Sequence, residues 1–249
     1  MIKSIIFALI FSLLSCRQKS KEQTILVSEE TFKKKELIKP EAKSDSVKTV
    51  LEETFADSTR VGIKGNFKLI VDQFRSDDST HVKINLFEKR TEKWFLKQQL
   101  EYLKDDITNC EPELKDFNND GFNDLTFKSS VAARGANEIR KLLIFDKIKK
   151  EFILMKNSDH YPNLQYNKLL NCVDAWLVYG GSSTVFLKIE KDSLREFAGV
   201  SLDDNQREIY IVDKKGNRKI LKKEFVKDLE VYIRYQNYSP LIENADSNN

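Results

Sequence analysis

Oxygen-bearing side chains recur at alternate positions of one short segment, Asp116–Leu125, with the spacing of a calcium-binding loop. Calcium takes six to eight oxygen ligands, and a loop of alternating acidic and amide residues can direct several oxygens at one point. Gly121 would allow the sharp reversal of the chain, because glycine adopts positive φ easily. The ligands that we expect are the side chains of Asp116, Asn118, Asp120 and Asp124, the backbone carbonyl of Phe122, and one or two waters.

The residues that follow this loop differ from those of an EF-hand. An EF-hand has a bidentate Glu at its twelfth position and flanking helices, whereas the twelfth position here is Phe127. Leu125–Phe127 alternates like a strand, so we expect the loop to connect two strands. Because this Glu is absent, we expect a dissociation constant for calcium of about 10⁻⁴ to 10⁻³ M, which is typical of extracellular modules. The alternative is a surface turn without metal, because Asn, Asp and Gly are common in turns.

No recognisable catalytic motif occurs in the sequence. The two histidines, His81 and His160, lie in polar turn segments, and neither belongs to a His-Glu-x-x-His zinc motif. A Gly-x-Ser-x-Gly nucleophile motif is also missing from the sequence. Adjacent acidic pairs such as Asp203–Asp204 point to opposite sides of a strand and are usually solvated. We therefore expect a protein that is not an enzyme, with a structural calcium ion.

The first residues, 1–15, have the features of a bacterial signal peptide. A basic start at Lys3 precedes an apolar run that is too short to span a membrane as a mature helix. The run ends in Leu13-Leu14-Ser15-Cys16, which resembles the bacterial lipobox and implies lipidation of Cys16. A plain transmembrane anchor is the alternative. We expect the protein to be lipid-anchored in the cell envelope, facing the periplasm or the outer membrane.

Residues 16–59 are rich in Lys and Glu and poor in aromatic residues, which predicts a disordered tether. A short helix around Ser44–Phe55 is an alternative within it, because apolar residues there have helical spacing. Export to an oxidising compartment makes Cys110 and Cys172 candidates for a disulfide, with two buried free thiols as the alternative.

Residues 60–243 are expected to form a single, mainly β domain. Short runs of alternating apolar and polar residues recur about ten residues apart, which predicts an antiparallel meander. Such a meander would close as a sandwich, a barrel or a small propeller. A minor helix is expected at Lys222–Tyr235, with a strand as the alternative. Both tryptophans, Trp94 and Trp176, are expected in the core, and residues 244–249 are expected to be disordered.

The segment Asp116-Phe117-Asn118-Asn119-Asp120-Gly121-Phe122-Asn123-Asp124-Leu125 resembles the calcium loop of FG-GAP repeats in integrin-type propellers. Only one copy is present, followed by Leu142–Asp146 and Glu151–Phe152. This arrangement is similar to the XAC2610-type exported bacterial proteins over about residues 67–202. Some of those proteins resemble periplasmic lysozyme inhibitors and act as immunity proteins, and the resemblance implies a partner that degrades peptidoglycan.

Two loops are candidates for contact with a partner, Asp159–Asn163 and Tyr179–Ser183. Within them we select Tyr161, Tyr179 and Ser182, because tyrosine is frequent among the residues that dominate binding energy. The alternative is that these tyrosines pack on the sheet. Basic residues are interleaved with acidic ones and an aromatic platform is lacking, so nucleic acid is not an expected partner.

The function expected from these features is binding, and inhibition, of a cell-wall hydrolase such as a lysozyme or a peptidoglycan-degrading toxin. The formal charge of +3 would give only weak long-range attraction to a basic lysozyme. The alternatives are a calcium-stabilised envelope module that binds glycan or protein, and a structural envelope lipoprotein.

Overall fold

The computed structural model describes residues 49–77, 79–227 and 232–243, which belong to one compact unit, Ser46–Asn249. The predicted signal peptide, Cys16, most of the predicted tether and the predicted tail (residues 244–249) lie outside the described residues. None of the helices in the described part is long and apolar enough to cross a membrane.

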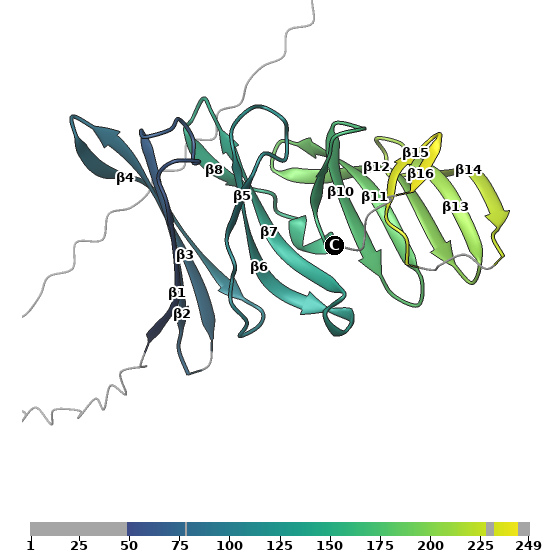
Figure 1. Cartoon of the computed structure of the whole chain (residues 1–249), viewed down its shortest axis with the longest axis horizontal. Coiled ribbons are helices and arrows are strands. Elements are labelled where there is room, and N and C mark those ends of the chain that lie inside the picture. The colour runs from purple at the N-terminus through teal and green to yellow at the C-terminus, as the bar shows by residue number, and fades with distance from the viewer. Residues whose placement is uncertain (1–48, 78, 228–231, 244–249) are drawn as a thin grey trace, which may run out of the picture. The chain divides into compact units, whose positions relative to one another are not determined.

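The first sheet has four antiparallel strands in the order β1-β2-β3-β4 (Figure 1). Its strands are β1 (Val50–Asp57), β2 (Phe67–Arg75), β3 (Thr80–Arg90) and β4 (Lys93–Lys104). Alternation fixes its buried face: Phe67, Leu69 and Val71 point into the core, while the residues between them are half-buried. The sequence pattern of this sheet therefore sets which face is covered.

The second sheet, β5-β6-β7-β8, lies between two apolar clusters. Its strands are β5 (Glu113–Lys115), β6 (Asp124–Ala132), β7 (Asn137–Asp146) and β8 (Glu151–Leu154), with short 3₁₀ turns at η1 (Ala133–Gly135) and η2 (Ser158–His160). On β7, Leu143 and Phe145 belong to the cluster shared with the first sheet, whereas Leu142 and Ile144 belong to the cluster shared with the third. A strand covered on both faces explains the unbroken apolar run at these positions.

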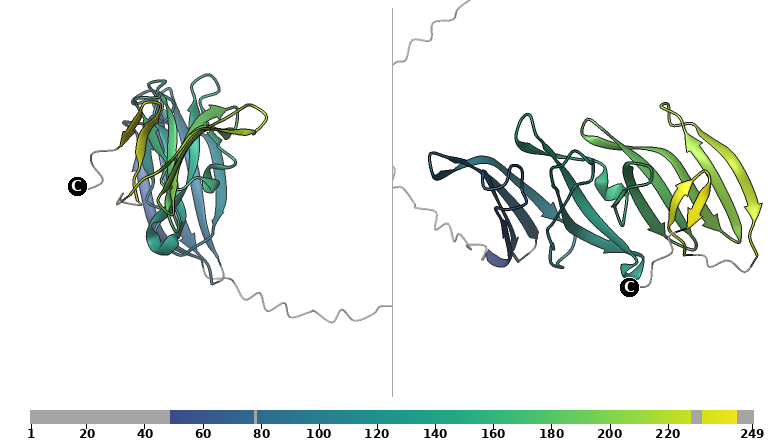
Figure 2. Two further views of the ribbon diagram at one scale, coloured as in Figure 1. Left: turned by 90° about the vertical axis from the view of Figure 1, so that its right-hand side faces the viewer. Right: turned by 45° about the horizontal axis from the view of Figure 1, so that its top comes forward.

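The third sheet has six strands in the order β14-β13-β12-β11-β10-β9. They are β9 (Gln165–Asn167), β10 (Cys172–Val178), β11 (Ser182–Glu190), β12 (Ser193–Asp203), β13 (Gln206–Val212) and β14 (Arg218–Phe225). One face of this sheet contributes to the cluster shared with the second sheet. A hairpin of β15 (Tyr235–Tyr238) and β16 (Leu241–Glu243) covers the opposite face, where buried Tyr235 packs with Phe186 and Val200 (Figure 2). The buried Arg234–Asp174 ion pair holds this hairpin to β10.

The predicted antiparallel β domain is confirmed. Among the described residues, none of the four sheets closes on itself, and a sandwich-like packing of open sheets fits the apolar clusters between them. A barrel, one of the predicted forms of closure, is therefore not formed by these strands.

Three sequence predictions are wrong. The folded part begins at Val50 rather than at residue 60, because β1 pairs with β2 and Phe55 packs against the first apolar cluster. That strand also replaces the alternative helix at Ser44–Phe55. The segment predicted as a helix at Lys222–Tyr235 begins as strand β14, which was the alternative, because pairing with β13 outweighs the weak helical pattern.

Tryptophan burial is the third wrong prediction. Trp94 is exposed on β4, and Trp176 is only half-buried on β10. Trp94 lies where β4 extends beyond the buried part of the first sheet, so apolar character alone did not indicate its position.

Candidate functional site

The predicted calcium loop, residues 116–123, joins two antiparallel strands as expected. Lys115 at the end of β5 pairs with Asp124 at the start of β6, and the intervening chain reverses between them. Asn119 and Gly121 have φ values of 58° and 86°, in the left-handed region. Glycine is suited to this reversal because it has no Cβ to oppose positive φ.

Two aromatic residues fix the loop to both apolar clusters. Buried Phe117 belongs to the cluster between the second and third sheets. Phe122 packs against the cluster between the first and second sheets, and its ring centroid is 5.8 Å from that of Phe145. The loop is therefore anchored on either side of the second sheet, which restricts where its polar side chains can lie.

Hydrogen bonds inside the loop involve the predicted ligands. Asp116 Oδ2 accepts a hydrogen bond from the Gly121 N–H at 2.9 Å. Asn118 Oδ1 accepts one from the Asp120 N–H at 3.0 Å, and Asp120 Oδ1 accepts one from the Phe122 N–H at 3.0 Å. These bonds hold the loop in a compact turn and place acidic side chains on it at close intervals.

Asp124 is the fully buried member of the set. Its Oδ2 accepts the Phe117 N–H at 2.8 Å and its Oδ1 accepts the Phe145 N–H at 2.9 Å. Burial, together with the charges of Asp116 and Asp120, raises the pKa of the Asp124 carboxyl to about 7, although the two hydrogen bonds oppose the shift. Asp116 and Asp120 are thus close enough to disfavour the charged form of Asp124.

The oxygen atoms of this loop are of the kinds that calcium binds, but they do not all point to one position. Carboxylate, amide and carbonyl oxygens are the ligands that calcium prefers, and a cation would offset the mutual repulsion of the three carboxylates. Within the described ranges, however, no three acidic, His or Cys side chains are grouped so that they could hold a metal ion. Calcium binding at this loop therefore stays a prediction.

The predicted hairpin at Tyr179–Ser183 is present between β10 and β11. Tyr179 is 45% exposed, and its hydroxyl lies 2.7 Å from Ser183 Oγ. Its backbone N–H donates to Gly181 O at 2.9 Å. A Cβ at Gly181 would lie 2.1 Å from Leu202 O, so only glycine fits where this turn meets β12. The tyrosine is therefore presented on a preformed turn.

The other two predicted contact residues are less accessible. Ser182 is buried, and its Oγ is 3.4 Å from Ile233 O, so its selection as a contact residue is corrected. Ser183 beside it is half-buried, and its hydroxyl lies 2.7 Å from that of Tyr179. Tyr161 is half-buried and packs against the second apolar cluster, so it follows the alternative of a tyrosine packed on the sheet.

A polar groove of about 440 Å³ adjoins Tyr179 on the third sheet, a feature that sequence reasoning missed. Strands β11 to β14 and their turns contribute its lining, which is Tyr179, Ser183, Ser201, Asp203, Asp204, Gln206, Glu208, Arg218 and Lys223. The Arg218 guanidinium lies 3.5 Å from the ring centroid of Tyr210. The lining residues come from four strands and their turns, so only the order of the strands in the sheet brings them together.

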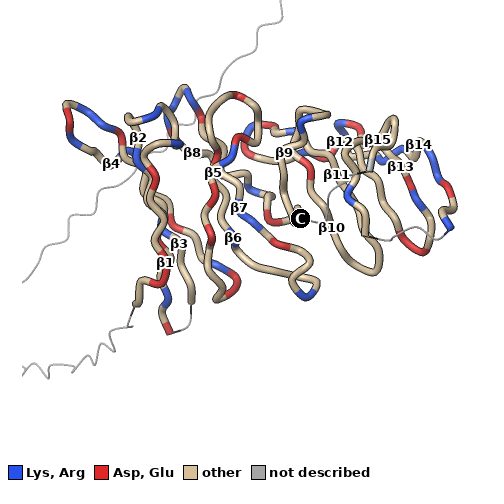
Figure 3. The backbone as a smooth tube through the Cα atoms, viewed as in Figure 1, with Lys and Arg blue, Asp and Glu red and all other residues tan. Residues whose placement is uncertain are grey.

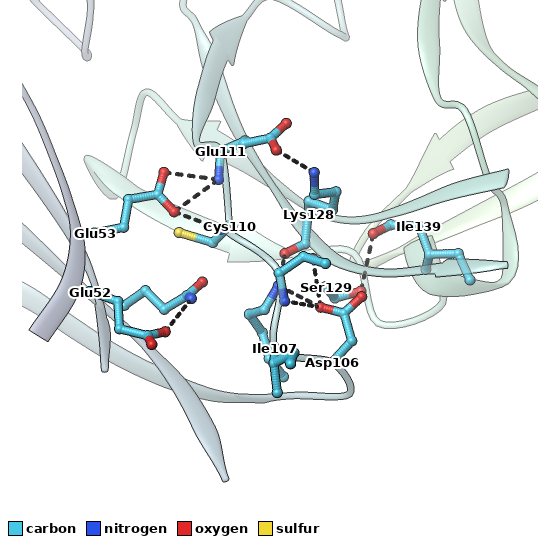
Figure 4. Close-up of polar contacts among 12 residues, drawn as sticks. Glu52, Glu53, Asp106, Ile107, Cys110, Glu111, Lys128, Ser129 and Ile139 are labelled. Carbon is cyan, nitrogen blue, oxygen red and sulfur yellow. Dashed lines mark hydrogen bonds and ion pairs between the residues drawn. The ribbon is translucent and has the colours of Figure 1, made fainter. Parts of the chain in front are cut away.

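The predicted disulfide is also corrected. Cys110 and Cys172 are free, buried thiols in different apolar clusters. Cys110 lies beside Glu53, which accepts the Cys110 N–H at 2.7 Å (Figure 4). Burial, with nearby carboxylates, raises the pKa of both thiols to about 12. A disulfide requires adjacent cysteine backbones, whereas these two cysteines are packed in separate cores.

One surface cluster has the residue types of a hydrolytic triad. Ser79 Oγ lies 2.8 Å from His81 Nε2, and His81 Nδ1 lies 3.6 Å from Glu101 Oε1. The His–Glu distance is too long for a direct hydrogen bond. Both side chains are open to water, and the Ser79 hydroxyl also contacts Ser76 Oγ at 2.7 Å. This geometry is that of a solvated polar cluster.

Similarity to known proteins is distant. No protein-family model matches the chain, and no curated protein matches it significantly. Among solved structures, the chain is similar to one described as the structure of a Xanthomonas type IV secretion system related protein. That match has a TM-score of 0.42 and 11% sequence identity, and it covers 73% of this chain and 96% of that chain. It assigns no function to this chain.

Proposed function

We propose that this chain is an exported bacterial lipoprotein that binds and inhibits a cell-wall hydrolase through a calcium-stabilised, non-enzymatic β domain. The resemblance of the 116–125 loop to FG-GAP loops and to XAC2610-type proteins supports this proposal. The lipobox-like residues before Cys16 support the anchor. With β1 starting at Val50, residues 17–49 would serve as the tether.

The observation that carries the proposal is the preformed Tyr179 hairpin beside the polar groove. An inhibitor gains affinity when its contact loop is already ordered, because less conformational entropy is lost on association. Tyr179 satisfies this condition, since its hydroxyl and its N–H are both bonded within the hairpin. An exposed tyrosine on a rigid turn can enter an enzyme cleft and remove a large apolar area from water.

Calcium has a supporting role in this proposal. The loop touches the clusters on both sides of the second sheet through Phe117 and Phe122. An ion bound there would stabilise the packing of the three sheets rather than take part in chemistry. Mass action predicts that the free energy of unfolding rises by about 1 to 2 kcal/mol when free calcium is roughly a few to tens of times the dissociation constant.

The direct test is inhibition of a panel of lysozymes and peptidoglycan-degrading toxins by the purified protein. We expect at least one enzyme to be inhibited, and Tyr179→Ala to weaken that inhibition at least tenfold, as for a residue that dominates binding. Phe95→Ala is the matched control, because Phe95 is equally exposed but lies on β4. Absence of inhibition across the panel, or an equal effect of both variants, would contradict the proposal.

Glycan binding is a second candidate, favoured by the groove itself. Its lining combines hydroxyls, carboxylates and a tyrosine, which can bond and stack on a sugar. Binding of soluble peptidoglycan fragments that Ser201→Ala or Asp203→Asn weakens, without inhibition of any hydrolase, would favour this function over the first.

A further inference from the structure

Three loops meet at one end of the first two sheets. The turn between β7 and β8 reaches the β3–β4 hairpin, because Lys150 Nζ lies 3.1 Å from Glu88 Oε1 and Lys97 Nζ lies 2.9 Å from Glu151 Oε1. The loop between β1 and β2 joins them through a hydrogen bond from the Lys89 N–H to Asn66 O at 2.8 Å. These contacts make the three loops a single rim.

The rim exposes large apolar side chains. Trp94, Phe95 and Leu96 are 39%, 45% and 54% exposed, and Ile148 at the neighbouring turn is 86% exposed. Ile63 on the β1–β2 loop is also exposed. Successive strand residues point to opposite faces, so exposure of three in a row means that this part of β4 is uncovered on both faces. We call Ile63, Trp94, Phe95, Leu96 and Ile148 the apolar rim.

Lys and Arg residues outnumber Asp and Glu around the apolar rim, and both kinds lie on its turns (Figure 3). Segments 60–66, 88–97 and 146–151 contain nine Lys and Arg residues against four Asp and Glu. Three of these acids are already neutralised: Glu88 by Arg90 and Lys150, Glu92 by Lys89, and Glu151 by Lys97. Lys64, Lys93 and Lys147 form no ion pair with another described residue, so their charges are available to an anionic partner.

We propose that the apolar rim docks on the surface of an anionic lipid bilayer. Aromatic and aliphatic side chains on one element, bordered by Lys and Arg, are suited to the interface between lipid headgroups and acyl chains. A hairpin exposed on both faces fits that medium, because lipid can surround it, whereas a protein partner would have to enclose it. Each rim lysine near an anionic surface adds attraction. This contact is separate from a lipid on Cys16.

Trp94 can report on docking directly, because the sequence has only two tryptophans. In a full chain with Trp176→Phe, Trp94 is the sole tryptophan fluorophore. We expect its emission to shift to the blue and to be quenched by brominated acyl chains in phosphatidylglycerol–phosphatidylethanolamine vesicles, but not in phosphatidylcholine vesicles. In the matched Trp94→Phe chain, Trp176 on β10 should be neither shifted nor quenched. This readout is local, so membrane binding by the leader does not imitate it.

Charge reversal tests the electrostatic part of the proposal. In the double variant Lys147→Glu, Lys149→Glu, the lipid concentration that gives half-maximal quenching of Trp94 should rise at least about thirtyfold. That is the change expected for losing two lysines at an anionic surface. The control, Lys214→Glu with Lys215→Glu, makes the same change in net charge at the β13–β14 turn and should have little effect. Unchanged Trp94 emission with anionic vesicles, equal quenching in phosphatidylcholine, or equal effects of the two double variants would overturn the proposal.

Discussion

At the scale of single residues, the acidic side chains of the 116–124 loop have distinct structural roles. Both carboxylate oxygens of buried Asp124 accept backbone hydrogen bonds that tie β6 to Phe117 and β7. Asp120 lies on the loop and accepts a hydrogen bond from the Phe122 N–H. The sequence spacing predicted this set of oxygens, but it could not show which of them also hold the backbone together.

Asp120→Asn should separate calcium binding from folding. The variant keeps an oxygen for the Phe122 N–H while it removes one of three repelling charges, so without calcium its melting temperature should equal or exceed that of the wild type. Calcium affinity should fall about tenfold or more, since ligand charge sets affinity in such loops. Calorimetry with Asp203→Asn as the control for loss of an acid would check this. Wild-type calcium affinity in the Asp120 variant would show that Asp120 is not a ligand.

Asp124→Asn should destabilise the fold with or without calcium. An Asn side chain has one acceptor oxygen, so its NH₂ group would face either the Phe117 or the Phe145 N–H and leave a buried donor unsatisfied. Such a loss costs about 1 to 3 kcal/mol. Chemical denaturation in chelator would measure it, and an unchanged free energy of unfolding would contradict the role assigned to these two hydrogen bonds.

The two domain thiols should be unreactive in the folded protein and free after unfolding. Both are buried, and pKa values of about 12 leave almost no thiolate at pH 8. We expect a thiol reagent to label neither Cys110 nor Cys172 under native conditions, and both in denaturant without reductant. A mass about 2 Da lower than that of the dithiol after non-reducing denaturation would show that the two cysteines form a disulfide.

At the scale of elements, strand periodicity predicted most of the sheets but not their ends. The alternating patterns of β2 and β3 indicate one buried face, and those strands are present. Strand β1 was missed because its Lys and Glu neighbours resemble a tether, and its burial depends on pairing with β2. Strand β14 was predicted only as the alternative to a helix, because local spacing allowed both and only pairing with the neighbouring strand decides between them.

Removal of β1 tests the corrected domain boundary. A chain that begins at residue 58 would expose the edge of β2 and lose Phe55 from the first apolar cluster. We expect it to be destabilised by at least about 2 kcal/mol relative to a chain that begins at residue 49. Thermal unfolding of the two chains gives the comparison. Equal melting temperatures would show that β1 does not contribute to the folded domain.

At the scale of the whole molecule, the second sheet and its loop connect the first sheet to the third. The apolar run at residues 142–145 contributes to clusters on both sides, and Phe117 and Phe122 attach the loop to the same two clusters. Sequence alone indicated a β domain and a metal loop. It could not indicate the polar groove or the apolar rim, because each is assembled from residues that are far apart in the chain.

The central claim, that calcium in the 116–124 loop stabilises this domain, is tested most directly by titrating the full chain with calcium. We predict binding heat with a dissociation constant of about 10⁻⁴ to 10⁻³ M. A gain of about 1 to 2 kcal/mol should raise the melting temperature by about 2 to 8 °C over that in chelator. No heat at millimolar calcium, together with the same melting temperature in calcium and in chelator, would contradict the claim.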